Sequence, residues 1–342
     1  MTREKFAVIH QTDCFHIHAD PDDHWDLACQ YALAYKDDID LKGVLIDYPP
    51  YNKIGNHYSG DPAIAAVEQL NYLCGQYVPV AVGEEKTKSV ETIVSEKHLN
   101  GGIRMILETL ENSSEKVAIQ IVGSCRDVAI AVRMRPDLFE KKCNGVYLNA
   151  GTAEEKREQE YNVSLDPISY KTMFSLPCPL YWMPCFQTLP FSESESKTNE
   201  TYFSFMQKEV LPFLGNGLKR YFSYALGREE SNQWLAYLKQ DVNEDFLKEQ
   251  GEKPREMWST AGILHAAGKT VDVNGKVWDA DKCKNETVFD VIPVSAVCND
   301  LGRVTWKRVN KSTQYIFVKT EDRQIYAKAM TNAIKEILSE LP

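Results

Sequence analysis

The stretch Asp20-Pro21-Asp22-Asp23-His24-Trp25-Asp26-Leu27, with Thr12-Asp13 shortly before it, indicates both the fold and the site of this chain. Both follow the apolar run Phe6-Ala7-Val8-Ile9, which predicts a buried strand. Five aspartates therefore fall within fourteen residues after that strand. Clustered carboxylates repel one another, and their burial is unfavourable unless a cation binds them. Because the clustered groups offer only oxygen, they favour a hard cation such as Ca²⁺ or Mg²⁺ over Zn²⁺.

The same aspartates have a second interpretation. Asp-Pro-Asp-Asp is also typical of a turn followed by a helix N-terminus, where one Asp caps the helix and further acids are stabilised by the helix dipole. The position between a first strand and a first helix favours the ligand site, because α/β proteins bind ligands at such places.

Strand and helix patterns alternate through the first half of the chain. This alternation predicts an α/β fold with a doubly wound, mostly parallel sheet and helices on both faces. The predicted strands are 6–12, 41–46, 78–82, 117–122, 145–148 and 180–183, and the predicted helices are 23–35, 61–73, 90–111, 126–135 and 166–175.

The pattern changes after residue 192. Residues 202–247 are rich in aromatic side chains and predict helices, so we expect 192–260 to form a helical subdomain or lid over one edge of the sheet. The absence of internal repeats and low-complexity tracts favours one large domain over residues 1–342. The tail predicts strands at 288–297 and 314–318 and a last helix at 323–338.

Composition limits the partners. The 342 residues carry a formal net charge of -10 and no basic run, which argues against nucleic acid or an anionic membrane as the main partner. No apolar stretch is long enough to span a membrane. Nine scattered cysteines without a C-x-x-C pair are typical of reduced thiols, so we expect a cytoplasmic protein, unless a leader peptide has been removed.

Three further blocks follow the aspartate cluster in the chain. The first is Ile121-Val122-Gly123-Ser124-Cys125-Arg126-Asp127, and the last is Ile263-Leu264-His265-Ala266. Between them, Val146-Tyr147-Leu148-Asn149-Ala150-Gly151 precedes Glu160-Tyr161-Asn162-Val163 and then Asp166-Pro167. In this order the four blocks resemble the inosine-uridine preferring nucleoside hydrolase family, calcium-dependent enzymes that cleave N-ribosides. The match runs along most of the chain, which therefore resembles a divergent member of this family.

The resemblance implies a Ca²⁺ site. It matches Asp13 to the family's aspartate after strand one and Asp22-Asp23 to its aspartate pair at the next helix, although Asp20 could take the first position instead. Asp13, Asp20, Asp23 and the backbone carbonyl of Ser124 are then the candidate Ca²⁺ ligands. Asp13 or Asp22 would accept the proton of a bound water, which combines metal-assisted nucleophile formation with general base catalysis.

The resemblance also implies a nucleoside pocket. Glu160 and Asn162 would hydrogen-bond the ribose hydroxyls, and Asn149 would line the sugar pocket. The loop after the second strand offers a further sugar-contacting residue among Asp47, Asn52 and Asn56. A planar base could stack on Tyr221 or Trp258, or on Phe222 or Tyr224.

The fourth block departs from the family pattern, which has His-Asp where this chain has His265-Ala266. His265 would assist the leaving base, but Ala266 removes a carboxylate that binds calcium in the family. This loss implies a metal shell completed by Asp20 or Asp26, weaker Ca²⁺ binding, or loss of activity. The pair Arg126-Asp127 also departs from the small and apolar residues usual in the second block.

The leading interpretation is hydrolysis of the N-glycosidic bond of a ribonucleoside with Ca²⁺ as cofactor. One alternative is a catalytically impaired protein that binds a nucleoside or sugar, and another is a hydrolase of a different glycosidic substrate. Phosphate transfer is disfavoured, because the chain has neither a P-loop nor Asp-x-Asp-x-Thr after the first strand. The exposed edges of a large α/β domain would allow a homo-oligomer.

Overall fold

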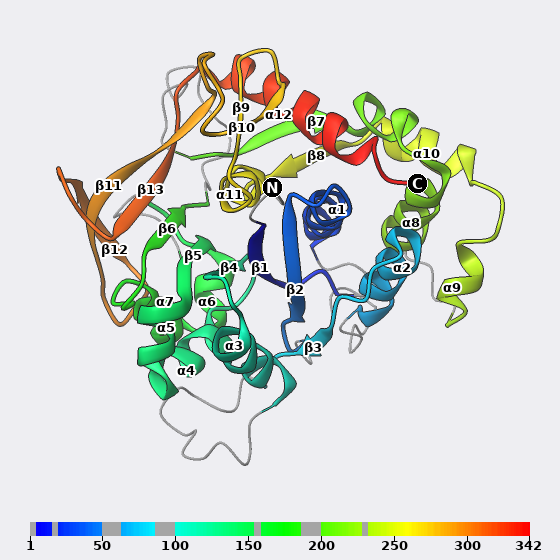
Figure 1. The fold of residues 1–342 in the computed structure, drawn as a ribbon. Helices are drawn as coiled ribbons and strands as arrows, with labels where there is room; N and C mark the ends of the chain where they lie inside the picture. The colour runs from blue at the N-terminus through cyan, green and yellow to red at the C-terminus, as the bar shows by residue number, and fades with distance from the viewer. Residues whose placement is uncertain are drawn as a thin grey trace.

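A mixed sheet forms the centre of the computed structural model, which describes residues 5–15, 20–49, 63–85, 100–153, 159–185, 200–227 and 232–342. Within these ranges its nine strands lie in the order β12-β11-β13-β6-β5-β4-β1-β2-β3 (Figure 1). The strands from β13 to β3 in this order are parallel, and β11 is antiparallel to both of its neighbours. The predicted doubly wound, mostly parallel sheet is confirmed. The strands are β1 (Phe6–Thr12), β2 (Ile39–Ile46), β3 (Val80–Val82), β4 (Val117–Ile121), β5 (Cys143–Asn149), β6 (Leu180–Met183), β11 (Phe289–Cys298), β12 (Val304–Arg308) and β13 (Gln314–Lys319).

Helices cover both faces of the sheet and enclose two apolar cores (Figure 1). Successive strand residues point to opposite faces, so Val8 joins one core while Ala7 and Ile9 join the other. The first core is packed by α1 (Pro21–Tyr35), α2 (Ile64–Cys74), α8 (Asn216–Leu226), α11 (Thr260–Ala266) and α12 (Arg323–Leu338). The second is packed by α3 (Gly101–Asn112), α4 (Arg126–Met134), α5 (Pro136–Lys142) and α7 (Pro167–Met173).

The strand order reverses at β1, which pairs with β2 on one side and with β4 on the other. The chain segments that leave the carboxyl ends of β1 and β4 therefore diverge and open a crevice between them. Ligands of doubly wound proteins bind at this switch point. The aspartate-rich segment after β1 lies at this place because of the topology.

The segment after β6 is mixed rather than wholly helical. Phe203–Met206 was expected to be helical, but it forms strand β7, which pairs antiparallel with β8 (Pro254–Met257). Its burial alternates along the strand, with Phe203 and Phe205 inside, so the period of two prevails over helix propensity. Between the two strands lie η3 (Gln207–Glu209), η4 (Leu211–Phe213), α8, α9 (Trp234–Tyr237) and α10 (Glu244–Gly251).

Short elements account for the other differences from the sequence prediction. Pro136 begins α5 instead of only ending the helix before it, and α6 (Tyr161–Leu165) and strand β12 were not predicted. The hairpin of β9 (Lys269–Val271) and β10 (Val277–Asp279) completes the described elements.

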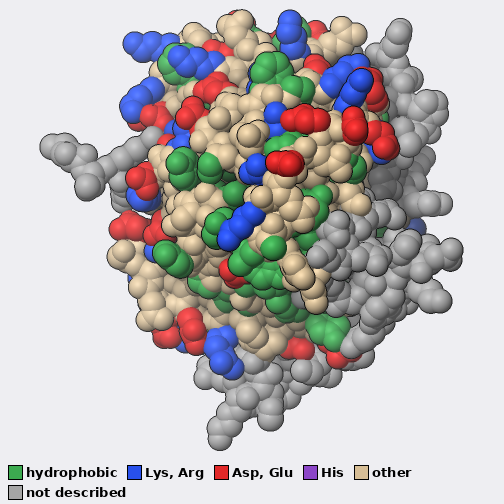
Figure 2. All heavy atoms as spheres, turned by 90° about the vertical axis from the view of Figure 1, so that its right-hand side faces the viewer, with side chains coloured by type: hydrophobic (Ala, Val, Ile, Leu, Met, Phe, Trp, Pro, Cys, Tyr) green, Lys and Arg blue, Asp and Glu red, His purple; other side chains and the backbone are tan. Residues whose placement is uncertain are grey.

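The face that carries α2, α8, α9 and α10 shows basic and acidic side chains intermixed, and neither sign dominates its described part (Figure 2). Among the described residues, no helix combines the length and the apolar character that a membrane span requires.

Candidate active site

A pocket of about 340 Å³ opens at the carboxyl ends of the parallel strands. Segments that follow β1, β4, β5 and β6 form its wall together with β8. Its lining residues are Asp20, Pro21, Asp22, Asp23, Val122, Asn149, Glu160, Tyr161, Asn162, Cys185, Arg255, Glu256 and Trp258. The topology therefore brings together most of the predicted site residues, although they are widely spaced in the chain.

Three carboxylates meet at the floor of this pocket. One oxygen each from Asp13, Asp20 and Asp23 lies within 4.8 Å of the others. The backbone N–H of Asp13 donates to Asp23 Oδ2 at 2.9 Å, and the Thr12 hydroxyl donates to the same oxygen. Asp13 is 2% exposed, and its Oδ1 is buried without a hydrogen-bond partner among the described residues. Among the described residues, none supplies a hydrogen-bond partner for that oxygen.

The start of α1 shows why these acids gather here. Pro21 is the first helical residue, and Asp22 and Asp23 lie in the first turn near the positive end of the helix dipole. Asp20 stands at the N-cap position, yet its side chain makes no capping hydrogen bond. The capping interpretation of Asp20 is therefore not realised, and both Asp13 and Asp20 belong to the carboxylate group instead of competing for one place.

Burial and mutual repulsion dominate the electrostatics of the cluster. Burial, followed by the neighbouring carboxylates, raises the pKa of Asp13, Asp22 and Asp23 well above the usual range. Burial also raises the pKa of Asp26 to about 7, although the Ser259 hydroxyl donates a hydrogen bond to it. A bound cation would favour the charged forms and would offset this repulsion.

At the end of β4 the residue that lines the pocket is Val122, two residues before the predicted carbonyl ligand Ser124. The Ser124 carbonyl accepts a hydrogen bond of 2.7 Å from Gln11 Nε2, and Ser124 does not line the pocket. Val122 lines the pocket, and its carbonyl accepts from Asn162 Nδ2 at 2.9 Å. The Ser124 carbonyl therefore stays a prediction as a ligand, and the Val122 carbonyl is an alternative candidate because Val122 lines the pocket.

Three residues that were predicted to bind or surround the sugar line the pocket: Asn162, Glu160 and Asn149. Their side chains differ in which donor and acceptor atoms remain available to bind a sugar. Asn162 Oδ1 is buried and has no hydrogen-bond partner among the described residues, so it is able to accept from a ligand hydroxyl. Glu160 instead accepts from three backbone N–H groups, those of Gly151, Asn162 and Val163. Asn149 Nδ2 donates to the Met183 carbonyl at 3.1 Å.

The Glu160 carboxylate caps α6, and this role yields a stability prediction. Glu160→Ala should lower the free energy of unfolding by about 1–2 kcal/mol, because three buried N–H groups lose their acceptor. Glu160→Gln, which keeps one acceptor oxygen, should lose less. Urea unfolding measures both. An unchanged unfolding midpoint together with a raised KM would mean that Glu160 serves the sugar rather than the helix.

No family model matches the sequence, and no curated protein matches it. Solved structures match nearly the whole chain. A purine-preferring ribonucleoside hydrolase from Gardnerella vaginalis is 13% identical with a TM-score of 0.56, over 98% of this chain and 99% of the other. An inosine-uridine preferring nucleoside hydrolase from Bacillus anthracis is 15% identical with a TM-score of 0.52, over 97% and 100%. The type III effector protein XopQ, solved in complex with adenosine diphosphate ribose, is 14% identical with a TM-score of 0.52, over 98% and 95%.

The chain has the nucleoside hydrolase fold. At this level of identity the likeness establishes the arrangement of strands and helices. The activity has to be argued from the side chains.

The position of His265-Ala266 in the structure does not support their match to the His-Asp pair of the nucleoside hydrolases. His265 lies in the last turn of α11, where its Nδ1 is 2.9 Å from the Tyr147 hydroxyl and its ring packs on Tyr181. Burial lowers the pKa of His265 to about 4. Because a helix rises about 1.5 Å per residue, His265 stands roughly 9 Å along the axis from Ser259 at the other end. The structure does not bring His265 to the pocket.

The end of α11 that meets the aspartates carries Trp258 and Ser259. Trp258 lines the pocket, and the Ser259 hydroxyl donates to Asp26. If this end corresponds to the His-Asp pair of the nucleoside hydrolases, the missing carboxylate is at Ser259, and Ala266 is a buried core residue. Serine is common just before the first residue of an apolar helix, so the sequence already indicated this alternative match.

Of the four predicted candidates for base stacking, the structure brings only Trp258 to the pocket. Tyr221 is fully buried in α8, where its hydroxyl is 3.1 Å from His24 Nδ1. Phe222 stacks on Trp25, and Tyr224 packs on Tyr237. The aromatic side chains of α8 therefore belong to the core that holds α1 in place.

Asp47 does not line the pocket, but its hydrogen bonds support the turn next to it. Its carboxylate accepts from the Ser124 N–H at 2.5 Å and from the Gln11 amide. Burial raises its pKa to about 7. Asp47 thus fixes the turn that follows Val122. The other two candidates from this loop, Asn52 and Asn56, lie outside the described residues.

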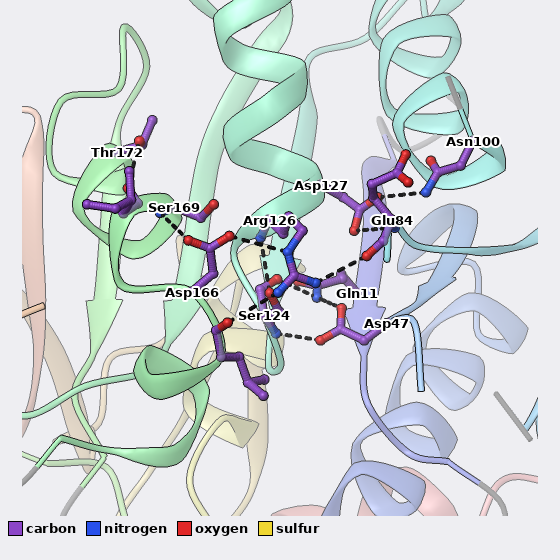
Figure 3. A network of polar contacts seen from close by, with 12 residues as sticks. Gln11, Asp47, Glu84, Asn100, Ser124, Arg126, Asp127, Asp166, Ser169 and Thr172 are labelled. Carbon is purple, nitrogen blue, oxygen red and sulfur yellow. Dashed lines mark hydrogen bonds and ion pairs between the residues drawn. The ribbon is translucent and has the colours of Figure 1, made fainter. Parts of the chain in front are cut away.

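Arg126, the first residue of α4, connects the segment after β3 to the turn between α6 and α7 (Figure 3). Its guanidinium donates to the Glu84 and Leu165 carbonyls at 3.1 and 3.2 Å and to Asp166 at 3.3 Å. Asp127 next to it accepts from the Glu84 N–H at 3.0 Å. The pair Arg126-Asp127, which departs from the family pattern, therefore forms a buried network of polar contacts.

Six of the residues that line the pocket were not predicted as site residues: Pro21, Val122, Tyr161, Cys185, Arg255 and Glu256. The last two lie on β8, shortly before the predicted residue Trp258.

Proposed function

We propose that the chain hydrolyses the N-glycosidic bond of a ribonucleoside or a close relative. The observation that carries this proposal is the buried group of Asp13, Asp20 and Asp23, whose Asp13 Oδ1 has no partner among the described residues. Asn162, with its buried acceptor oxygen, lines the pocket above this group. Such a group of residues can bind a cation with its water next to the hydroxyls of a sugar.

The donor set fits Ca²⁺. Calcium takes oxygen ligands at about 2.3–2.6 Å, so ligands on opposite sides of the ion lie roughly 5 Å apart. The carboxylate oxygens of Asp13, Asp20 and Asp23, all within 4.8 Å of one another, meet this requirement. The Val122 carbonyl is the fourth candidate ligand from the chain. Bound Ca²⁺ would supply positive charge that lowers the pKa of a water and orients two ribose hydroxyls.

Asp13 is the preferred general base. Its Oδ1 lacks a partner among the described residues, so it is able to accept the proton of a water bound beside it. The water oxygen forms a bond to C1′, its proton passes to Asp13, and the N-glycosidic bond breaks with its electron pair on the base nitrogen. The transition state resembles an oxocarbenium ion. Asp22, at the pocket wall, is the second candidate for the base.

The remaining lining residues hold the substrate. Asn162 Oδ1 accepts from a ribose hydroxyl, which disfavours analogues that lack it because the buried acceptor would stay unpaired. The Trp258 ring provides a face for the base. Its Nε1 is buried without a partner among the described residues and can donate to an acceptor on the base.

A second candidate function is a nucleoside- or sugar-binding protein without catalysis. If the pocket end of α11 corresponds to the family's His-Asp pair, Ser259 favours this function, because a hydroxyl then stands in place of the carboxylate. A protein of this fold that is described as an effector also favours it. Saturable nucleoside binding without base release would establish this alternative.

Removal of calcium gives the direct test. We expect base release from a panel of purine and pyrimidine ribosides to stop in chelator and to return when Ca²⁺ is added. We also expect Ca²⁺ to raise the melting temperature, because a ligand that binds only the folded state stabilises it. Turnover that is unchanged in chelator would contradict the metal-assisted mechanism. A calcium-dependent thermal shift without turnover on any riboside would favour the binding protein.

A further inference from the structure

Arg255 is the one cationic side chain among the described residues that line the pocket. It lies on β8, opposite Phe205 in the two-stranded sheet with β7. Met257 on the same strand is fully buried, which anchors the hairpin to the core. The backbone therefore holds Arg255 at a fixed place in the pocket wall.

The side chain of Arg255 is half-buried, and its guanidinium makes no hydrogen bond to another described residue. Its Nε is inaccessible and has no partner among the described residues. Burial lowers the pKa of Arg255, against the opposing charges of Asp22, Asp20 and Glu256. Arg126 offers the contrast, because its guanidinium donates three hydrogen bonds in its own buried place. A buried donor without an acceptor is costly, so the position of Arg255 is best explained by an acceptor that arrives with the ligand.

The neighbouring acids do not serve as that acceptor. None of the ion pairs between described residues includes Arg255, although Asp20 and Asp22 line the same pocket. Glu256 accepts a hydrogen bond of 3.1 Å from the Tyr202 hydroxyl. Asp20 belongs to the proposed Ca²⁺ group. The guanidinium is thus available for an anion on the substrate, for which its planar set of donors is suited.

We propose that Arg255 binds a phosphate group on the substrate, so that the substrate class is ribosides phosphorylated at C5′. This inference rests on the proposed function for the orientation of the ribose. With the 2′ and 3′ hydroxyls at the Ca²⁺ group and C1′ facing the water, C5′ is the ribose carbon that remains to carry an anion to Arg255 in the same pocket. Arg255 is then the residue that selects phosphorylated over unphosphorylated ribosides.

The test compares nucleosides with their 5′-monophosphates. For the unmodified protein with Ca²⁺ we expect kcat/KM for base release to be at least about tenfold higher on the 5′-monophosphate. Arg255→Gln should reduce this preference by about 10- to 100-fold, the range for a charge-assisted hydrogen bond. Arg255→Lys, which keeps the charge but loses the planar fork, should fall between the two. Arg133→Gln removes the same charge from an exposed position of α4 and should leave the preference unchanged.

A binding measurement separates this inference from the proposed function. Titration calorimetry with ribose 5-phosphate, ribose and inorganic phosphate as probes needs no turnover. Arg255-dependent binding of ribose 5-phosphate without hydrolysis of any riboside would support the ligand class and overturn the hydrolase proposal. Hydrolysis with no preference for phosphorylated substrates, or a preference that Arg255→Gln leaves intact, would overturn the inference and leave the hydrolase standing. Inorganic phosphate that binds as tightly as ribose 5-phosphate would also overturn it, because the site would then take a free anion.

Discussion

Asp13→Asn is expected to lower kcat/KM for base release by about 10³-fold, within the range measured for loss of a general base. The substitution keeps the shape of the side chain but removes the charge that accepts the proton of water. It also removes one of three carboxylates from the proposed Ca²⁺ group, so calcium binding should weaken as well. Steady-state kinetics at saturating Ca²⁺, with calcium titration calorimetry on the same sample, would separate the two effects.

The matched control for Asp13→Asn is Asp245→Asn, which makes the same change at an exposed position of α10. It should leave turnover and calcium binding as they are. Full activity of Asp13→Asn at saturating Ca²⁺ would exclude Asp13 as the base and move that role to Asp22. Activity lost in both variants would point to a general sensitivity to charge and would not support the assignment.

Arg126→Met is expected to lower the free energy of unfolding by about 3 kcal/mol, the lower end of the range for removing one partner of a buried ion pair. The change removes the cation from Asp166 and one donor each from the carbonyls of Glu84 and Leu165. These groups belong to segments after β3 and around α6, so the strand ends that position the pocket should loosen together (Figure 3). Urea unfolding followed by tryptophan fluorescence measures the loss.

The control for Arg126→Met is Arg133→Met, which makes the same change on the exposed side of α4. It should shift the unfolding midpoint little, because surface substitutions usually change stability by less than about 0.5 kcal/mol. An Arg126→Met protein as stable as the unmodified one would mean that water replaces the guanidinium. The segments around Arg126 would then not depend on it.

The parallel sheet was predictable because its signals are local. Apolar runs such as Val117–Ile121 end at turn residues and are followed by amphipathic helices, and this alternation recurs through the first half of the chain. The amphipathic final helix was predicted at 323–338 and is α12 (Arg323–Leu338), with its N-cap at Asp322. The helical prediction for Phe203–Met206 was wrong, because the partner strand that makes it a strand lies about fifty residues further along the chain.

Part of the pocket followed from the sequence for the same reason. Asp13, Asp20 and Asp23 directly follow β1 or begin α1, and the parallel topology places such residues at one edge of the sheet. Asn149, Glu160 and Asn162 follow β5 in the same way and line the pocket with the aspartates. In contrast, the match of His265-Ala266 rested on a short motif alone. The helix that carries it could present either end to the pocket, and the structure presents the end with Trp258 and Ser259.

The sequence by itself determined the sheet, the carboxylate group after β1 and the polar residues after β5, because periodicity and strand ends are encoded by neighbours in the chain. Only the tertiary structure decided that Val122 and Arg255 line the pocket with the aspartates, and that Tyr221 is buried in the core. These features depend on which way individual side chains point and on contacts between segments far apart in the chain. Such contacts are fixed by how the two cores pack against the sheet, and no local pattern records that packing.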